Sequence, residues 1–268
     1  MKNVFKKIIK YLLLHHLDLF PATLTNKEEL KLLIQKLHPK TQQTKFKRLG
    51  PLGDGGYLVP DDFKGIEACF SPGVSSIIGF EKDCADLGMK VFMADGSVDG
   101  TIEFHKNFSF IKKYIGATNN DNFITLDEWV NTSPLEVKSD LLLQMDIEGY
   151  EYETFISITN KLMKRFRIIV VEFHNLDLLW CQPFYKLASR AFEKILQTHT
   201  CVHIHPNNYL SSKTIYDICI PYLMEFTFLR NDRIINAEIE TVFPHPLDSD
   251  NIESNQTLVL PKCWYEKA

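Results

Sequence analysis

The chain contains two short runs of almost uninterrupted apolar residues, "DLLLQM" at 140–145 and "RIIVV" at 167–171. Strands that are apolar on both faces are typical of a parallel sheet that is covered by helices on both sides. Each run is followed by a longer segment of helical character, which is the pattern of β-α-β units. These runs therefore predict an α/β fold with a buried, mostly parallel sheet.

The alternation of short strands and longer helices continues from residue 66 almost to residue 230. Ligands of such sheets bind beyond the carboxyl ends of the strands, so functional residues are expected there. A further helix is expected near 26–38, and 46–63 is expected to form turns around a short strand. The other expected strands are 66–70, 90–95, 108–116, 200–205 and 223–229, and the other expected helices are 77–88, 151–166 and 184–199.

Composition and charge restrict the partners and the compartment. The chain has 268 residues, 45% of them hydrophobic, which is enough for a sizeable core. Its net charge of −4 argues against a nucleic-acid partner, because general nucleic-acid-binding proteins usually carry a basic excess. The six cysteines are scattered and form no CxxC motif, which fits reduced, buried thiols in a cytoplasmic protein.

The N-terminal segment "FKKIIKYLLL" at 5–14 has the pattern of an amphipathic helix. Its apolar run is too short for a membrane span, and no small-residue cleavage site follows it. We expect this helix to pack on the domain or on a second copy in a homodimer, with a peripheral membrane contact as the alternative. The predicted organisation is an N-terminal helical extension, 1–45, followed by one Rossmann-like domain, 46–268.

Three predicted strands end in residues that suit proton transfer or metal binding. Imidazole transfers protons near neutral pH, and a mixed set of carboxylates and imidazole can also ligate a divalent ion such as magnesium or manganese. Any one of these residues could instead be a helix cap or a hydrogen-bonded buried histidine, but their shared position at strand ends favours a site. The residues are Asp146 and Glu148 after the strand at 140–145, Glu172 and His174 at the end of the next, and His203 and His205 in "VHIHPNNY".

The loop after the first strand of the alternating pattern, "SPGVSS" at 71–76, is a candidate cofactor loop. Gly73 would let backbone approach a ligand, and the following strand ends at Asp95, at the spacing of an acid that binds a ribose. The loop lacks a GxGxxG pattern, which disfavours a dinucleotide. Upstream, Gly55 and Gly56 in "DGGY" indicate a tight turn, or backbone that closes over a ligand.

An ordered set of motifs resembles the FkbM-type S-adenosylmethionine-dependent methyltransferases. The segment "MDIEGYEYE" at 145–153 resembles the Asp-x-Glu-Gly-x-Glu motif of that family. The segments "DGGY", "SPGVSSIIGFEKDCADLG", "FMADGSV", "ITLDEWV", "VVEFH" and "HIHPNN" occur in the family's order, so that the similarity covers about residues 46–230. The resemblance implies a class I methyltransferase fold, a seven-stranded sheet whose last strand inserts antiparallel, with helices on both faces.

The same resemblance implies positions for the S-adenosylmethionine cofactor. Ser71 and Gly73 would line its amino-acid part, and Asp95 its ribose. Asp146 would lie beside the methionine part or the acceptor. Ser71 stands where the family commonly has an acid, so Glu81 or Asp54 is expected to contact the cofactor's amino group instead. The adenine would lie by Ile115 and Gly116.

The function implied by the resemblance is O-methylation of a sugar, a polysaccharide or a natural-product precursor. His174 or His205 is expected to be the general base, with Asp146 and Glu148 orienting the acceptor. A divalent cation such as Mg²⁺ on the carboxylates is the alternative route to hydroxyl activation. The competing functions are a nicotinamide-dependent oxidoreductase, a glycosyltransferase, and a non-catalytic partner that keeps the fold.

Overall fold

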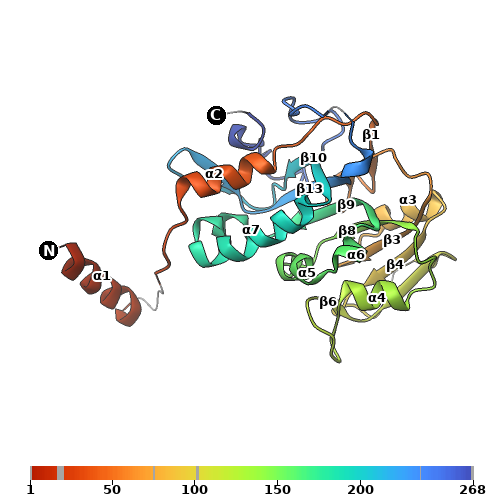
Figure 1. Ribbon diagram of the computed structural model, residues 1–268, viewed down its shortest axis with the longest axis horizontal. Coiled ribbons are helices and arrows are strands. Elements are labelled where there is room, and N and C mark those ends of the chain that lie inside the picture. Colours follow the sequence, from red (N-terminus) through yellow and green to blue (C-terminus); the bar gives the residue numbers. More distant parts are fainter. Residues whose placement is uncertain (1, 17–20, 75, 101–102, 236, 267–268) are drawn as a thin grey trace.

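The computed structural model describes residues 2–16, 21–74, 76–100, 103–235 and 237–266 (Figure 1). The main strands are β3 (Ile66–Pro72), β4 (Lys90–Ala94), β5 (Phe108–Ile111), β8 (Asp140–Met145), β9 (Phe166–Phe173), β10 (His199–Pro206) and β13 (Met224–Arg230). The helices are α1 (Lys2–His16), α2 (Lys27–Lys36), α3 (Gly79–Asp86), α4 (Leu126–Thr132), α5 (Glu151–Ser157), α6 (Asn160–Met163) and α7 (Gln182–Leu196). Short elements are β1 (Phe46–Leu49), β2 (Tyr57–Pro60), β6 (Tyr114–Ile115), β7 (Phe123–Ile124), β11 (Ser212–Ile215), β12 (Ile218–Pro221), η1 (Leu176–Trp180), η2 (Asn231–Arg233) and η3 (Lys262–Trp264).

The seven main strands form one sheet in the order β10-β13-β9-β8-β3-β4-β5. The pairs from β9 to β5 are parallel, whereas β13 runs antiparallel to both of its neighbours, β9 and β10. The predicted seven-stranded, mostly parallel sheet with an inserted antiparallel last strand is confirmed. Because β3, β4, β8 and β9 are parallel, their carboxyl ends lie at the same edge.

Residues along the central strands alternate between two hydrophobic cores, one on each face of the sheet. Leu141 and Leu143 belong to the core that is shared with α2, α4, α5 and α7, and Leu142 belongs to the core shared with α3 and β2. Figure 1 shows α5 and α7 side by side on one face of the sheet. Burial on both faces explains why the middle of β8 (141–143) and the middle of β9 (168–171) are entirely apolar, with the polar residues at or near the strand ends.

Two expected elements are interrupted in the structure. The helix expected at 151–166 is split into α5 and α6, because Ile158 is extended and the Thr159 side chain caps α6 by accepting a hydrogen bond from Leu162 N. The strand expected at 108–116 is also split. Its first part is β5 of the main sheet, and its second part is β6, which pairs with β7 in a separate sheet.

The two N-terminal helices differ in their burial. Leu30, Leu33 and Ile34 of α2 lie in the main core, whereas α1 stands apart in Figure 1 and exposes Phe5 and Ile8. The packing of α1 on the domain is therefore not seen, and its contact with a second copy or a membrane surface stays a prediction. The predicted boundary at residue 45, between the N-terminal extension and the domain, also stays a prediction. No helix within the described ranges has the length and hydropathy that a bilayer span requires.

Candidate functional site

The carboxyl ends of β8 and β9 bring predicted site residues together around His174. Its Nε2 atom lies 3.7 Å from Asp146 Oδ1, 3.4 Å from Glu148 Oε2 and 3.8 Å from Glu172 Oε1. Glu148 is 86% exposed and reaches in from the loop after β8, whereas Glu172 is 5% exposed. Three carboxylates thus surround one imidazole nitrogen.

The orientation of His174 is fixed by Glu151, the first residue of α5. The fully buried Glu151 carboxylate lies 3.1 Å from His174 Nδ1 and also accepts hydrogen bonds from the backbone N–H groups of Ile147 and Gly149. Since a carboxylate accepts hydrogen bonds, Nδ1 carries a proton and donates to it. In the neutral imidazole, the lone pair is then on Nε2 and faces the other three carboxylates.

The backbone at this site adopts conformations that most residues avoid. Glu148 has φ 56° and Asn175 has φ 57°, both in the left-handed region, and Gly149, which lies against the Asn175 side chain, has φ 102°. A non-glycine residue in such a conformation costs about 1–3 kcal/mol, and such residues concentrate at functional sites. These turns place Glu148 over His174 and begin η1 directly after the histidine.

A cavity of about 530 Å³ lies beside the His174 cluster, over the carboxyl ends of β8, β9 and β10. We call it the acceptor cavity. Among the described residues that line it there is no lysine or arginine, so it is acidic and rich in hydrogen-bonding groups. Its polar lining includes Asp54, Asn207, Tyr209, Tyr222 and Asn251 in addition to the His174 cluster.

A second cavity, of about 580 Å³, lies over the carboxyl ends of β3 and β4, and we call it the cofactor cavity. It contains four of the residues that the resemblance assigns to the cofactor: Gly73, Asp95, Ile115 and Asp146. Both cavities are lined by Asp54, Asp146 and Glu148. They therefore adjoin, and a ligand in one can meet a ligand in the other at these carboxylates.

Gly73, which lines the cofactor cavity, lies directly against the backbone of Asp146. It has φ 87°, and a Cβ atom there would lie 1.5 Å from the backbone oxygen of Asp146. No side chain fits, so glycine is required for the loop after β3 to lie against the end of β8. Gly55 also has a positive φ and lines a small side cavity of about 30 Å³.

Among the other residues predicted to contact the cofactor, Asp54 lines the cofactor cavity, whereas Ser71, Glu81, Gly55, Gly56 and Gly116 do not. Ser71 is fully buried, with Oγ 2.5 Å from both Glu81 Oε1 and Gln144 Oε1. Glu81 lines the small side cavity together with Asp54, so both acids expected to replace the family's acid lie next to Gly73. Gly56 packs on Pro51 and Arg48, and Gly116 packs beside Phe123.

The buried carboxyl groups of the site hold their protons unusually tightly. The pKa of Asp146 is raised to about 7, first by burial and then by the negative charges of Glu148, Glu151 and Asp54, although His174 opposes the rise. Burial also raises the pKa of Glu172 well above its usual range, and Asp146 adds to the effect. Burial lowers the pKa of His174, but the hydrogen bond that it donates to Glu151 and the surrounding carboxylates outweigh this effect, so that the pKa is raised.

His205 is not brought to the His174 cluster. Its Nδ1 atom lies 3.7 Å from Asp248 Oδ2, and His203 Nε2 lies 2.8 Å from Asp248 Oδ1. The two histidines share a face of β10, as alternation predicts, but they hold the C-terminal segment that contains Asp248. Asn251 of this segment lines the acceptor cavity and donates a hydrogen bond to Glu225. Glu225 belongs to β13 and pairs with Glu172 of the neighbouring strand β9.

Two features of the site were not predicted from the sequence. Glu151 belongs to the motif "DIEGYE", yet its role as the partner of His174 depends on the turn at Gly149. Asn251 lies far along the chain in a segment without regular structure, and no local pattern marks it. The sequence feature that could have identified Glu151 is its position at the start of a helix, close to a strand end that carries acids.

Residues 82–200 match the family model described as "Methyltransferase FkbM domain". Among solved structures, the chain is similar to a "putative methyltransferase from antibiotic biosynthesis pathway" of Anabaena variabilis ATCC 29413, with 12% identity and a TM-score of 0.29 over 56% of this chain and 61% of that one. It is also similar to EvdMO1, with 12% identity and a TM-score of 0.29 over 82% of this chain and 49% of that one. The chain thus spans less than two thirds of either structure. No curated protein matches the chain.

The sheet order and the family match together define the class of the protein. The order β10-β13-β9-β8-β3-β4-β5, with β13 antiparallel, is the class I methyltransferase fold that the motifs imply. Residues 82–200, somewhat less than half of the chain, match the model of the methyltransferase FkbM domain, which agrees with the resemblance of the motifs. The match includes Asp95, Asp146, Glu148 and His174.

Proposed function

We propose that this protein transfers the methyl group of S-adenosylmethionine to a hydroxyl oxygen of a sugar or of a polysaccharide or natural-product precursor. The observation that carries the proposal is the junction of the two cavities at Asp146, Glu148 and Asp54. A methyltransferase must hold a cofactor and an acceptor against each other in line, and two adjoining cavities supply that arrangement.

The charge of the cofactor cavity supports S-adenosylmethionine as its ligand. The sulfonium and the amino group of this cofactor are positive, and the described lining contains Asp54, Asp95, Asp146 and Glu148 but no lysine or arginine. A dinucleotide or a nucleoside diphosphate sugar would place phosphates against the same carboxylates. The acidic lining therefore disfavours the oxidoreductase and glycosyltransferase alternatives.

The composition of the acceptor cavity supports a polyhydroxyl acceptor. Asn207 and Asn251 provide amide groups, and Tyr209 and Tyr222 provide phenol groups beside the carboxylates. Such groups donate to and accept from hydroxyls in several directions. Phosphorylated or strongly anionic acceptors would be repelled by Asp54, Asp146, Glu148 and Glu172, so we expect the accepting sugar to be neutral or to carry an amino group.

His174 is the group that activates the acceptor hydroxyl. The acceptor oxygen forms a bond to the methyl carbon while the carbon–sulfur bond breaks, S-adenosylhomocysteine leaves, and the hydroxyl proton must be removed. His174 Nε2 faces the junction of the cavities, since Glu151 holds the opposite nitrogen. Two routes are open to it: to accept the proton as a general base, or to hold a cation that weakens the O–H bond.

The test of the proposal is the thermal unfolding of the full chain with S-adenosylhomocysteine in the presence of chelator. A ligand at a hundred times its dissociation constant stabilises the folded state by about 2.7 kcal/mol, which gives a clear shift in Tm. Asp95→Asn should weaken binding about 10–100-fold, because it removes a charged hydrogen-bond acceptor. The matched control is Asp99→Asn, an exposed acid that pairs with Lys112 and lines neither cavity.

Two outcomes would contradict the proposal. The first is an unchanged Tm at millimolar S-adenosylhomocysteine, and the second is an equal loss of binding in Asp95→Asn and Asp99→Asn. Stabilisation by a nucleoside diphosphate sugar, with none by S-adenosylhomocysteine, would favour the glycosyltransferase alternative instead.

A further inference from the structure

Three ligand atoms at the junction of the two cavities have the spacing of a metal coordination shell. One oxygen each of Asp146 and Glu148, together with a ring nitrogen of His174, lie within 4.8 Å of one another. His174 Nε2 is 3.7 Å from Asp146 Oδ1 and 3.4 Å from Glu148 Oε2. In an octahedral shell with bonds of about 2.1 Å, neighbouring ligands are about 3.0 Å apart and opposite ligands about 4.2 Å. The observed separations fall within or close to that range.

One buried carboxylate oxygen at this point lacks a proton donor. Asp146 Oδ1 is buried and accepts no hydrogen bond from any described residue. Glu172, which is only 5% exposed, uses Oε2 to accept a hydrogen bond from Asn207, while its Oε1 lies 3.8 Å from His174 Nε2 and has no hydrogen bond among the described residues. Buried carboxylate oxygens are normally satisfied, so Asp146 Oδ1 indicates a missing positive partner.

No cationic side chain among the described lining residues supplies that partner. The acceptor cavity contains Asp54, Asp146, Glu148 and Glu172 and no lysine or arginine. Buried charges are paired or coordinate metals, because an isolated buried charge is strongly unfavourable. His174 is thus the one described lining residue whose side chain can carry a positive charge opposite these carboxyl groups.

The hydrogen bond from His174 Nδ1 to Glu151 is of the kind that metal-binding histidines make with their second ring nitrogen. Such a histidine almost always donates its second ring N–H to a carboxylate or carbonyl, which fixes the ring and makes the ligating nitrogen more basic. Glu151 accepts from Nδ1 here and is itself held by the N–H groups of Ile147 and Gly149. Glu151 is therefore a positioning residue for Nε2.

We propose that Asp146, Glu148 and His174 bind one divalent cation, with Glu172 Oε1 as an additional or water-mediated ligand. Mixed carboxylate and imidazole ligands suit a cation such as Mn²⁺ better than Mg²⁺, which prefers ligands that are all oxygen. Binding of the ion rests on the geometry alone. Its use rests on the proposed function: at the junction of the cavities, the ion would lower the pKa of an acceptor hydroxyl. The cation route then replaces His174 as a general base.

The experiment is a titration of the chelator-treated, dialysed full chain with Mn²⁺, followed by electron paramagnetic resonance of the free ion. We expect one Mn²⁺ per chain. Glu148→Gln should weaken binding at least 10-fold, and this residue is 86% exposed, so the variant should fold. Glu151→Gln should weaken binding about 10–100-fold, as loss of the carboxylate behind a histidine ligand does. The matched control is Glu153→Gln, an exposed acid of the same helix outside the cluster, which should bind like the wild type.

Absence of stoichiometric Mn²⁺ binding would overturn the proposal, and so would equal binding by the wild type and Glu148→Gln. Failure of the proposed function is distinguishable, because S-adenosylhomocysteine binding is measured separately in chelator. Mn²⁺ binding without cofactor binding would support the proposed metal site and contradict the proposed methyltransferase function. Cofactor binding without Mn²⁺ binding would support the proposed function, contradict the metal site and favour His174 as the general base.

Discussion

The two ends of strands β8 and β9 carry charges in opposite arrangements. At the amino ends, Asp140 of β8 accepts a hydrogen bond from Arg167 of β9, so unlike charges meet. At the carboxyl ends, Asp146 and Glu172 approach the same histidine, so like charges meet. The paired charges at the amino end and the like charges at the carboxyl end are only five or six residues apart along each strand.

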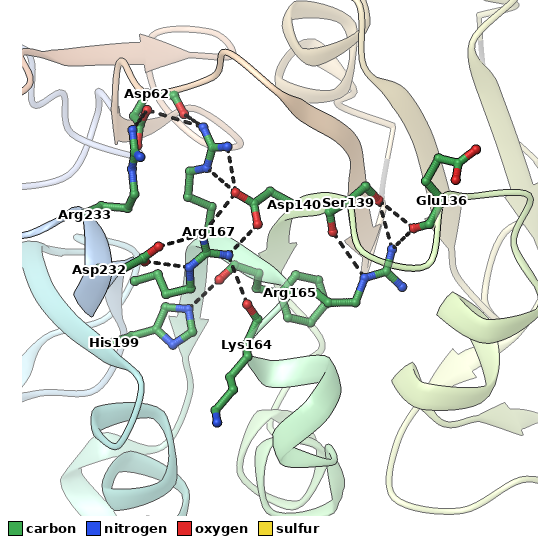
Figure 2. A network of polar contacts seen from close by, with 12 residues as sticks. Asp62, Glu136, Ser139, Asp140, Lys164, Arg165, Arg167, His199, Asp232 and Arg233 are labelled. Atoms are coloured by element: carbon green, nitrogen blue, oxygen red, sulfur yellow. Dashed lines mark hydrogen bonds and ion pairs between the residues drawn. The ribbon is translucent and has the colours of Figure 1, made fainter.

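Figure 2 shows the amino-end network, in which the carboxylates of Asp62, Asp140 and Asp232 each face an arginine. Arg167 donates to Asp140 and to Asp62, Arg233 also contacts Asp62, and Arg230 contacts both Asp140 and Asp232. Burial alone would raise the pKa of Asp140, but hydrogen bonds from Arg230 and Arg167 outweigh it, and the pKa lies below its usual range. This end of the sheet is electrostatically satisfied.

The carboxyl end is left unsatisfied in the same molecule. Its acids have raised pKa values, two of its non-glycine residues have positive φ, and buried oxygens lack donors. Perturbed acids and strained backbone concentrate at functional sites. The difference indicates that the amino end stabilises the sheet, whereas the carboxyl end lacks such compensation, as expected for the proposed ligand site.

The largest expected effect is on turnover at the carboxyl end. His174→Ala should lower kcat about 10²–10⁴-fold, because it removes the group that activates the hydroxyl. Binding of S-adenosylhomocysteine in chelator should stay within a few-fold of the wild type, since His174 lines the acceptor cavity and not the cofactor cavity. The measurement is S-adenosylhomocysteine release with a hydroxyl acceptor that the wild type methylates. His105→Ala, outside both cavities, is the control, and unchanged turnover in His174→Ala would remove His174 from the mechanism.

The next effect is on stability at the amino end. Asp140→Asn should lower the free energy of unfolding by about 3 kcal/mol, because removing one partner of a buried charge network leaves Arg167 with a single carboxylate. Chemical denaturation at pH 7 measures the change. Asp232→Asn is the milder comparison, since the Asp232 side chain is 59% exposed. A loss no larger for Asp140 than for Asp232 would mean that the network does not stabilise the sheet.

A third prediction concerns pH and His199, which also lies at this end of the sheet. Its Nε2 lies 2.8 Å from the Phe166 carbonyl oxygen, and burial lowers its pKa to about 4. The unfolded chain binds a proton near pH 6.5 and the folded chain does not, so this contribution to stability is complete above pH 6.5. It is lost as the pH falls towards 4, by about 2.5 kcal/mol between pH 7 and pH 4.5.

Denaturation midpoints of the wild type and His199→Gln at these two pH values isolate that contribution. Glutamine can still donate to the Phe166 carbonyl but does not titrate. The variant should therefore lose less stability on acidification than the wild type does. Parallel losses in the two proteins would show that His199 does not control the acid sensitivity.

The sequence predicted the carboxyl end of the sheet better than the amino end, for a physical reason. Asp146 and His174 directly follow apolar strands, and parallel pairing alone puts them at one edge. Arg167 and Asp62 lie far apart in the chain, and no periodicity links an arginine at a strand start to an acid in a distant loop. The split of the helix at Thr159 was also missed, because a side-chain cap competed with the helical pattern.

The acceptor cavity shows where prediction from strand ends stops. Glu172 was found because it ends a strand, but Asn251 reaches the cavity only through contacts between the C-terminal segment and β10 and β13. His205 was predicted for the site by the same strand-end rule and instead faces Asp248. Strand ends therefore locate the edge of the sheet, and tertiary contacts decide which of their side chains face the ligand.

The smallest expected effect separates the two ends most directly, because the same kind of substitution should change stability in opposite directions. Glu172→Gln keeps the shape of the side chain and the hydrogen bond from Asn207, but it removes one carboxyl group from a crowded acidic cluster. In metal-free buffer at pH 7, it should raise the free energy of unfolding by about 1 kcal/mol, whereas Asp140→Asn lowers it. Chemical denaturation of both variants beside the wild type is the measurement. A loss of stability in Glu172→Gln would mean that the carboxylate is compensated in the folded protein, and the contrast between the two ends would then rest on the backbone strain alone.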